Sequence, residues 1–134
     1  MNLPRADIVD AITAALPGVE AVYLFGSTDT ADERADSDVD LAFLSHHPVA
    51  AMQRWEFAQR LAGRLGRDVD LVDLSGASTV LRAQVVAQGR RLFCKDEQAC
   101  ERFEDYVFSA YARLNESRRE ILRQIAREGR IHGG

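Results

Sequence analysis

The feature that most constrains the fold of this chain is a pair of short apolar runs separated by a polar stretch. The first run, residues 21–25, is rich in strand-forming side chains and stops at Gly26-Ser27. Ten residues separate this dipeptide from Asp38-Val39-Asp40, which opens a second run over residues 39–44. The sequence therefore predicts two strands, with a small-residue turn after the first and two carboxylates at the start of the second.

Asp38 and Asp40 are expected on one face of the second strand, because side chains alternate along a strand with a period of two. Val39 and Leu41 then face the opposite side, toward a core. Two carboxylates on one face repel each other unless a cation lies between them. Magnesium takes oxygen ligands and usually keeps phosphate and water in its shell, so the pair predicts a magnesium site.

Gly26 and Ser27 are candidates for binding a phosphate beside that pair. Gly26 has no Cβ, so a ligand can approach its backbone closely, and Ser27 adds a hydroxyl and an N–H group. A short helix starting near Ser27 would present free N–H groups, which favour an anion. Together, the turn and the carboxylates suit a divalent metal that carries a nucleoside triphosphate.

A third carboxylate is expected in a later strand over residues 67–74. Asp70 lies inside this strand, where an acidic side chain is uncommon unless it is paired or has a function. Asp68 shares a face with Asp70 and stays open as the alternative, although Asp68 and Asp73 lie nearer the strand ends. We therefore choose Asp70 as the third acid of the site.

The rest of the chain predicts an α/β order of elements. Apolar residues at helical spacing predict helices over residues 4–16 and 50–65, and a further helix is expected over residues 79–88. Trp55 is expected to anchor the second helix in the core. A short last strand is expected over residues 90–94, where we interpret Arg90 and Arg91 as charges that compensate a helix end; contact with a phosphate is the alternative.

One long helix is predicted for about residues 96–127, which contain no Gly or Pro. An apolar stripe follows it at three-, four- and seven-residue spacing. Two interpretations stay open: the stripe packs wholly on its own domain, or its second half extends past the sheet and helps bind a partner. The stripe consists of Phe103, Val107, Ala110, Leu114, Ile121 and Ile125.

Length and charge narrow the class of protein. A chain of 134 residues is expected to form a single domain, residues 1–134, with a real core. The formal net charge of -4 argues against direct nucleic-acid binding. Charge interrupts every long segment, so no signal peptide or membrane span is expected, and we expect a cytoplasmic protein. Cys94 and Cys100 are accordingly expected to be reduced.

The Gly26-Ser27 turn, the Asp38-Val39-Asp40 pair and the later Asp70 resemble the motifs of the DNA polymerase β-like nucleotidyltransferase superfamily, and within it the minimal nucleotidyltransferase group. The resemblance implies a small mixed sheet flanked by helices. It also implies that the three carboxylates bind two magnesium ions, that the third helps activate the attacking hydroxyl, and that the turn holds the triphosphate of ATP. Small members of this group are often antitoxins that transfer AMP to a tyrosine of a HEPN-domain ribonuclease toxin.

The chain departs from this family pattern directly after Ser27. Family members often carry basic residues there, whereas residues 28–36 contain four acids and one cation, Arg34. Extra negative charge beside a triphosphate should weaken nucleotide binding unless those side chains point outward.

Two other functions stay open at this stage. One is a non-catalytic antitoxin that neutralises the toxin by covering it. The other is an enzyme that transfers AMP to a small molecule such as an aminoglycoside. The short chain leaves almost no room for a domain that holds a separate acceptor, which favours a partner protein that brings its own hydroxyl.

Overall fold

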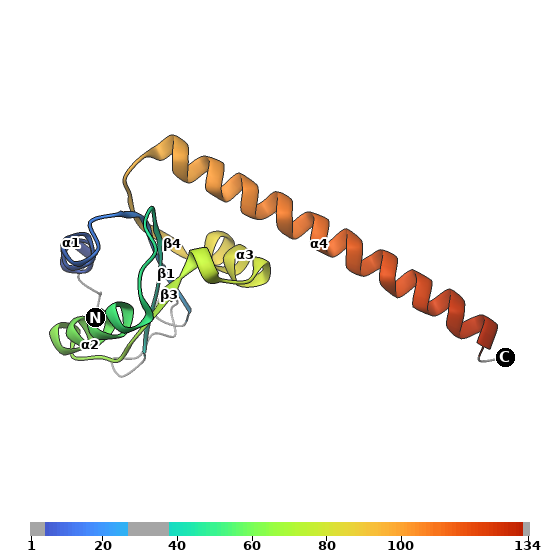
Figure 1. Ribbon diagram of the computed structural model, residues 1–134, viewed down its shortest axis with the longest axis horizontal. Helices are drawn as coiled ribbons and strands as arrows, with labels where there is room; N and C mark the ends of the chain where they lie inside the picture. Colours follow the sequence, from blue (N-terminus) through green and yellow to red (C-terminus); the bar gives the residue numbers. More distant parts are fainter. Residues whose placement is uncertain (1–4, 27–37, 133–134) are drawn as a thin grey trace.

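The computed structural model describes residues 5–26 and 38–132, which form four helices and a four-stranded mixed sheet (Figure 1). The sheet has the strand order β3-β2-β1-β4, with β1 antiparallel to β2 and β4, and β2 parallel to β3. The elements are α1 (Arg5–Ala15), β1 (Val19–Phe25), β2 (Val39–Ser45), α2 (Ala51–Leu65), β3 (Val69–Asp73), a 3₁₀ turn (Leu74–Gly76), α3 (Thr79–Gln88), β4 (Arg90–Cys94) and α4 (Glu97–His132).

The mixed sheet and the long last helix agree with the predicted fold class. β2 and β3 can be parallel because α2 carries the chain back between them, as a parallel pair requires. α2 ends at Gly66, whose φ of 68° is the left-handed conformation that closes a helix. α3 begins where the Ser78 hydroxyl accepts a hydrogen bond from the Leu81 N–H at 3.1 Å.

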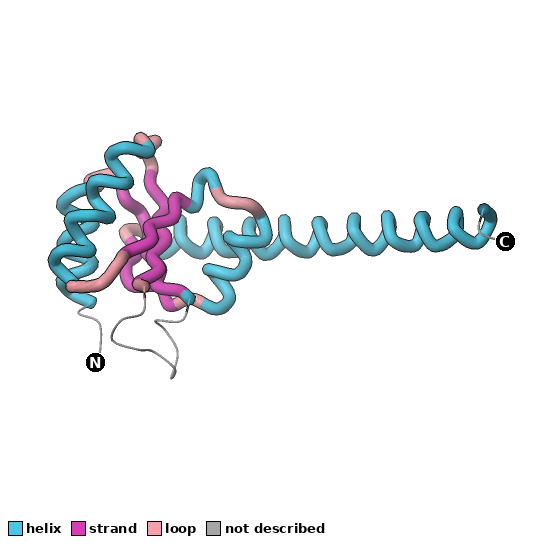
Figure 2. The backbone as a smooth tube through the Cα atoms, turned by 90° about the horizontal axis from the view of Figure 1, so that it is seen from below, coloured by secondary structure: helices cyan, strands magenta, loops and turns pink. Residues whose placement is uncertain are grey.

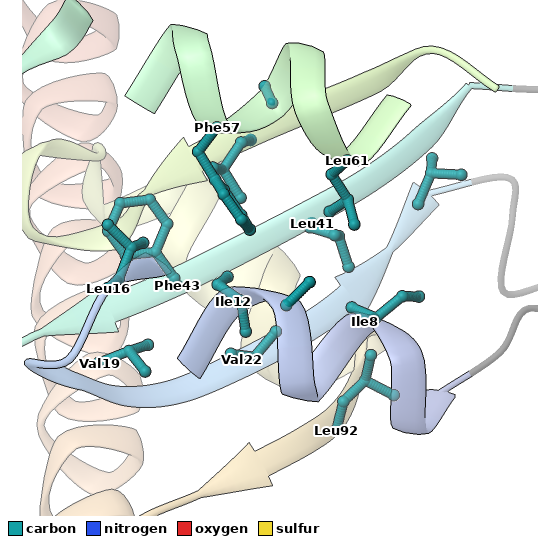
Figure 3. Close-up of a cluster of buried hydrophobic side chains, with 14 of the residues drawn as sticks. Ile8, Ile12, Leu16, Val19, Val22, Leu41, Phe43, Phe57, Leu61 and Leu92 are labelled. Carbon is teal, nitrogen blue, oxygen red and sulfur yellow. The ribbon is translucent and has the colours of Figure 1, made fainter. Parts of the chain in front are cut away.

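One face of the sheet is covered by α1 and α2, and a large cluster of buried apolar side chains lies between them and the strands (Figure 3). Val39 and Leu41 lie in this core, as their alternation along the strand predicted. The helices contribute Ile8 and Ile12 from α1 and Phe57, Ala58 and Leu61 from α2.

Trp55 does not belong to that core, contrary to our prediction. Its side chain is 59% exposed, whereas Phe57 is 4% exposed and takes the buried position. Trp55 lies two residues before Phe57 on α2, so the helix turns one ring toward the sheet and the other away.

The opposite face is covered by α3 and the first part of α4, as Figure 2 shows from a second direction. Its core is smaller and contains Ala21, Tyr23, Ala42, Leu74, Val85 and Cys100. Asp40 and Asp70 belong to this face. Asp40 lies two residues before Ala42, which is in this core, and Asp70 lies two residues before Val72, which packs against it; residues two apart on a strand share a face.

The helix α4 continues well beyond the sheet (Figure 1). Val107 is buried, but residues 116–128 are all exposed, including Ile121, Leu122 and Ile125. The interpretation in which the whole stripe packs on its own domain is therefore wrong, while partner binding stays a prediction. The helix also ends at His132 rather than near residue 127, because Gly129 alone does not stop it.

Cys94 and Cys100 are joined in a disulfide, so our expectation of two reduced thiols is wrong. The bond connects the end of β4 to the first turns of α4. Sequence spacing gave no sign of it, because five residues lie between the two cysteines and the contact arises only when α4 folds back over β1, where Cys100 is buried.

None of the helices in the described ranges combines the length and apolar character that a bilayer crossing requires.

Candidate active site

Asp40 and Asp70 are neighbours at one end of the sheet. They are register partners in the parallel pair of β2 and β3, each one residue after the start of its strand. Phe25, the last residue of β1, is the register partner of Asp40 on the other side. The end of β1 and the beginnings of β2 and β3 therefore meet, and they bring Gly26, Asp40 and Asp70 together.

Gly26 lies directly against the Asp40 carboxylate. Its φ of +79° is a left-handed conformation, and a Cβ built on its backbone would lie 2.2 Å from Asp40 Oδ2. No side chain fits there without moving that carboxylate, so glycine is required for both conformation and space. Ser27, the second residue of the predicted turn, and the acidic stretch that follows it lie outside the described residues.

The pKa of Asp40 is raised above its ordinary value. Burial is the largest cause, followed by the negative charges of Asp70 and Asp38. Both of these neighbours are exposed, whereas Asp40 is partly buried between them. The charges of Asp38 and Asp70 thus both act on Asp40, and a cation beside it would relieve the repulsion.

The donor set of this site fits magnesium. Carboxylate oxygens are hard ligands, and magnesium is usually held by one or two carboxylates with phosphate and water completing its shell. Within residues 5–26 and 38–132, no three acidic, histidine or cysteine side chains converge closely enough to hold a metal ion unaided. The phosphates of a nucleotide would have to supply the remaining ligands.

Two other acids lie near Asp70, one before β3 and one at its end. Asp68 precedes the strand with an exposed side chain, and its backbone carbonyl accepts a hydrogen bond from the Val39 N–H at 2.8 Å. Asp73 caps the following turn, because its Oδ1 accepts hydrogen bonds from Ser75 N at 3.0 Å and Ser75 Oγ at 2.7 Å. Asp70 alone is in register with Asp40, which favours it over Asp68 as the third acid.

Arg91 is engaged away from the carboxylates. Its guanidinium pairs with Glu104 of α4, at 2.8 Å, and with Glu97. This pairing ties β4 to α4, a role that neither of our two interpretations of Arg91 included. Arg90, on the same strand, is exposed.

Tyr23 lies beside that ion pair and was not singled out by the sequence. Its hydroxyl is buried without a hydrogen-bond partner among the described residues. Burial, followed by the Glu104 charge, raises the pKa of Tyr23 to about 12, although the nearby Arg91 guanidinium lowers it. Tyr23 is the register partner of Ala42 on β2 and of Arg91 on β4. Ala42 lies two residues after Asp40 on β2.

Comparison with known proteins identifies the family of the chain. The family model of polymerase beta nucleotidyltransferases matches residues 8–98. The protein adenylyltransferase MntA of Shewanella oneidensis is 39% identical over 124 residues, which are 92% of this chain and 88% of that protein.

Solved structures are similar over nearly the whole chain. A toxin–antitoxin crystal structure with AMP-PNP has a TM-score of 0.82 at 38% identity, and the match covers 92% of this chain and 99% of the other. A complex of a tri-AMPylated HEPN toxin of Shewanella oneidensis with its MNT antitoxin has a TM-score of 0.75 at 37% identity, covering 91% and 95%. The chain belongs to the polymerase β-like nucleotidyltransferase family.

Proposed function

We propose that this chain is the antitoxin of a HEPN/MNT toxin–antitoxin pair and a protein adenylyltransferase that acts on its toxin. The relative from Shewanella oneidensis carries that activity in its name, and a similar antitoxin was solved with an AMPylated HEPN toxin. ATP is the proposed AMP donor, since another similar complex contains the ATP analogue AMP-PNP. The proposed compartment is the cytoplasm.

The observation that carries this proposal is the row formed by Gly26, directly after β1, and by Asp40 and Asp70 on the neighbouring strands β2 and β3. Gly26 leaves its backbone open beside Asp40, where a triphosphate can approach, and Ser27 follows it in the chain. Asp38, Asp40 and Asp70 are the proposed magnesium ligands, with two ions as the family resemblance implies. Bound magnesium would neutralise phosphate charge at this edge of the sheet.

The reaction proposed for this site is nucleotidyl transfer to a tyrosine hydroxyl. The acceptor oxygen forms a bond to the α-phosphorus of ATP, and the bond from that phosphorus to the oxygen bridging to the β-phosphate breaks. AMP remains on the tyrosine and pyrophosphate leaves. Asp70 takes the proton of the acceptor hydroxyl as general base.

The test is the intact mass of the neighbouring HEPN-type toxin after incubation with this chain, ATP and magnesium. We expect the toxin to gain one or more AMP units. Asp38→Asn should reduce the rate at least about 100-fold, the scale of losing a group that stabilises transition-state charge. Asp105→Asn, which changes an exposed carboxylate on α4, is the matched control and should keep the full rate.

Each outcome of this experiment decides between functions. A stable complex without any mass gain would favour an antitoxin that acts by binding alone. Neither complex nor mass gain would favour transfer to a small molecule. Full activity of Asp38→Asn would refute the metal role of that residue.

A further inference from the structure

The strand β3 ends the sheet with an edge that can accept another strand. It is the outermost strand on its side in the order β3-β2-β1-β4 of the described chain. The Asp68 carbonyl points toward β2, because it accepts the hydrogen bond from Val39 N–H at 2.8 Å. Backbone groups alternate along a strand, so the N–H and C=O groups of Val69 and Leu71 point away from β2.

A groove of about 630 Å³ follows this edge between β3 and α2. Val69, Asp70 and Leu71 line it on the strand side. On the helix side it is lined by the side chains of Met52 and Trp55, which are 66% and 59% exposed, and by Arg54. The groove therefore reaches the edge of the sheet at Asp70, whose side chain lies with Asp40 on the face opposite α2.

The opposite edge of the sheet is closed to such an addition. On β4, the Leu92 carbonyl accepts hydrogen bonds from Arg5 Nε at 3.2 Å and Arg5 Nη2 at 2.9 Å. Proteins commonly cover strand edges in this way to prevent unwanted pairing. The contrast with β3 singles out the groove edge as the place where an extended chain can pair with the sheet.

We propose that this groove is the acceptor site, and that it binds an extended segment of the toxin as an added strand on β3. The segment carries the tyrosine that receives AMP, so the inference rests on the proposed function. Edge addition supplies main-chain hydrogen bonds to Val69 and Leu71. The tyrosine ring packs against Trp55 and Met52, and its hydroxyl extends past the beginning of β3 to reach the Asp70 side chain on the other face.

The order of the strands explains why the groove suits the acceptor rather than the nucleotide. Gly26 follows β1, Asp40 lies on β2, and Asp70 lies on β3, with about 5 Å between neighbouring strands. Phosphates at Gly26 and an acceptor in the groove therefore approach the carboxylates from opposite sides. Transfer by displacement needs this arrangement, because the attacking and leaving oxygens lie in line across the phosphorus.

Trp55 is the only tryptophan of the chain, which makes it a direct reporter of the groove. We would label the chain with 5-fluorotryptophan and record the single ¹⁹F resonance while adding unlabelled toxin, with complex formation followed by gel filtration. We expect the resonance to shift with the toxin and to stay in place with ATP and magnesium alone.

Three results would overturn the acceptor assignment. A shift with ATP and magnesium alone would place the nucleotide in the groove. A shift that depends only on the concentration of this chain would place a second copy there. An unchanged resonance in a stable, AMP-transferring complex would place the acceptor elsewhere, while the proposed function would stand. If no complex forms and no AMP is transferred, the proposed function fails and this inference fails with it.

Kinetics provide a second measurement. Trp55→Ala should raise the KM for the toxin about tenfold, the scale of an interface aromatic, and more than it raises the KM for ATP. Tyr106→Ala, which removes a similarly exposed ring on α4, is the control. An equal effect of the two variants on the KM for the toxin would contradict the assignment.

The added strand has its own test at Val69. Proline is tolerated at the first residue of a strand, and Val69→Pro would remove an outward N–H group without touching the bonds to β2. Val69→Ala removes the same side chain but keeps the N–H. We expect Val69→Pro to transfer AMP to the toxin several-fold more slowly than Val69→Ala, and equal rates would rule out strand addition.

Discussion

The two faces of the sheet differ in what they bury. The face under α1 and α2 buries the larger apolar cluster, with Phe43 and Leu41 fully enclosed. The face under α3 and α4 has a smaller apolar cluster, the neighbouring carboxylates of Asp40 and Asp70, an arginine held by two glutamates, and a tyrosine hydroxyl that has no hydrogen-bond partner among the described residues. We expect the first face to contribute more to stability, because burial of apolar surface stabilises the fold, whereas like charges and a buried hydroxyl without a partner cost free energy.

The largest effect on stability is expected on the apolar face. Phe43→Ala would remove a fully buried ring and leave a cavity, at a cost of about 3–5 kcal/mol in the free energy of unfolding. Denaturant unfolding measures it. Phe108→Ala, at a ring that is 45% exposed on α4, should cost far less. Similar costs for the two variants would contradict the assignment of the stabilising core to this face.

A smaller loss of stability is expected from substitution of Gly26, which follows β1 and lies against the Asp40 carboxylate. Gly26→Ala would combine a strained backbone, about 1–3 kcal/mol, with a clash against Asp40 Oδ2. Gly66→Ala is the matched control: its φ is also positive, but a Cβ there would meet nothing within 4 Å. Denaturant unfolding should show the loss from backbone strain alone in Gly66→Ala, and that loss plus the cost of moving the carboxylate in Gly26→Ala.

AMP transfer separates the two glycine variants. We expect Gly26→Ala to transfer AMP at least about tenfold more slowly than Gly66→Ala, since a displaced catalytic group costs that much or more. Equal transfer rates would show that the position of the Asp40 carboxylate has no bearing on the reaction.

The smallest effect concerns the charge of Asp40 in the absence of nucleotide. Because its folded pKa is raised, Asp40 contributes stability below its ordinary pKa of 3.8 and loses that contribution as the pH rises through the raised value. Asp40→Asn should therefore be more stable than the parent protein at pH 7, by about 1 kcal/mol or less, since the partly open site is screened by solvent.

That difference should shrink as the pH is lowered toward 4, which thermal unfolding at several pH values would detect. Asp105→Asn, at an exposed carboxylate, is the control for removing one negative charge. Magnesium with ATP should reverse the order by stabilising the parent protein over Asp40→Asn. A destabilised Asp40→Asn at pH 7 without ligands would contradict the proposed repulsion.

Local patterns predicted most of the fold and the site. Alternation placed Val39 and Leu41 in the core and Asp40 on the opposite face, and the parallel register makes Asp70 the neighbour of Asp40. Gly26 was predicted from its place after the first strand and from its lack of a Cβ.

Features that depend on distant contacts were not predictable in this way. Trp55 and Phe57 are equally hydrophobic rings on one helix, and only the docking angle of α2 decides which of them is buried. The Cys94–Cys100 bond and the pairing of Arg91 with Glu104 require the direction in which α4 leaves β4. Strand order determines which edge is open, and a single sequence contains no direct sign of it.

The outer part of α4, residues 116–132, is expected to unfold locally more often than the rest of the protein. It is roughly 25 Å long at about 1.5 Å per residue, and residues 116–128 are all exposed. A helix of this length without tertiary support is only marginally stable in water. Its amide hydrogens should therefore exchange with solvent much faster than those of the sheet, because this part of the helix can unfold locally while the sheet stays folded. Slower exchange in the presence of the toxin would identify this segment as part of the contact.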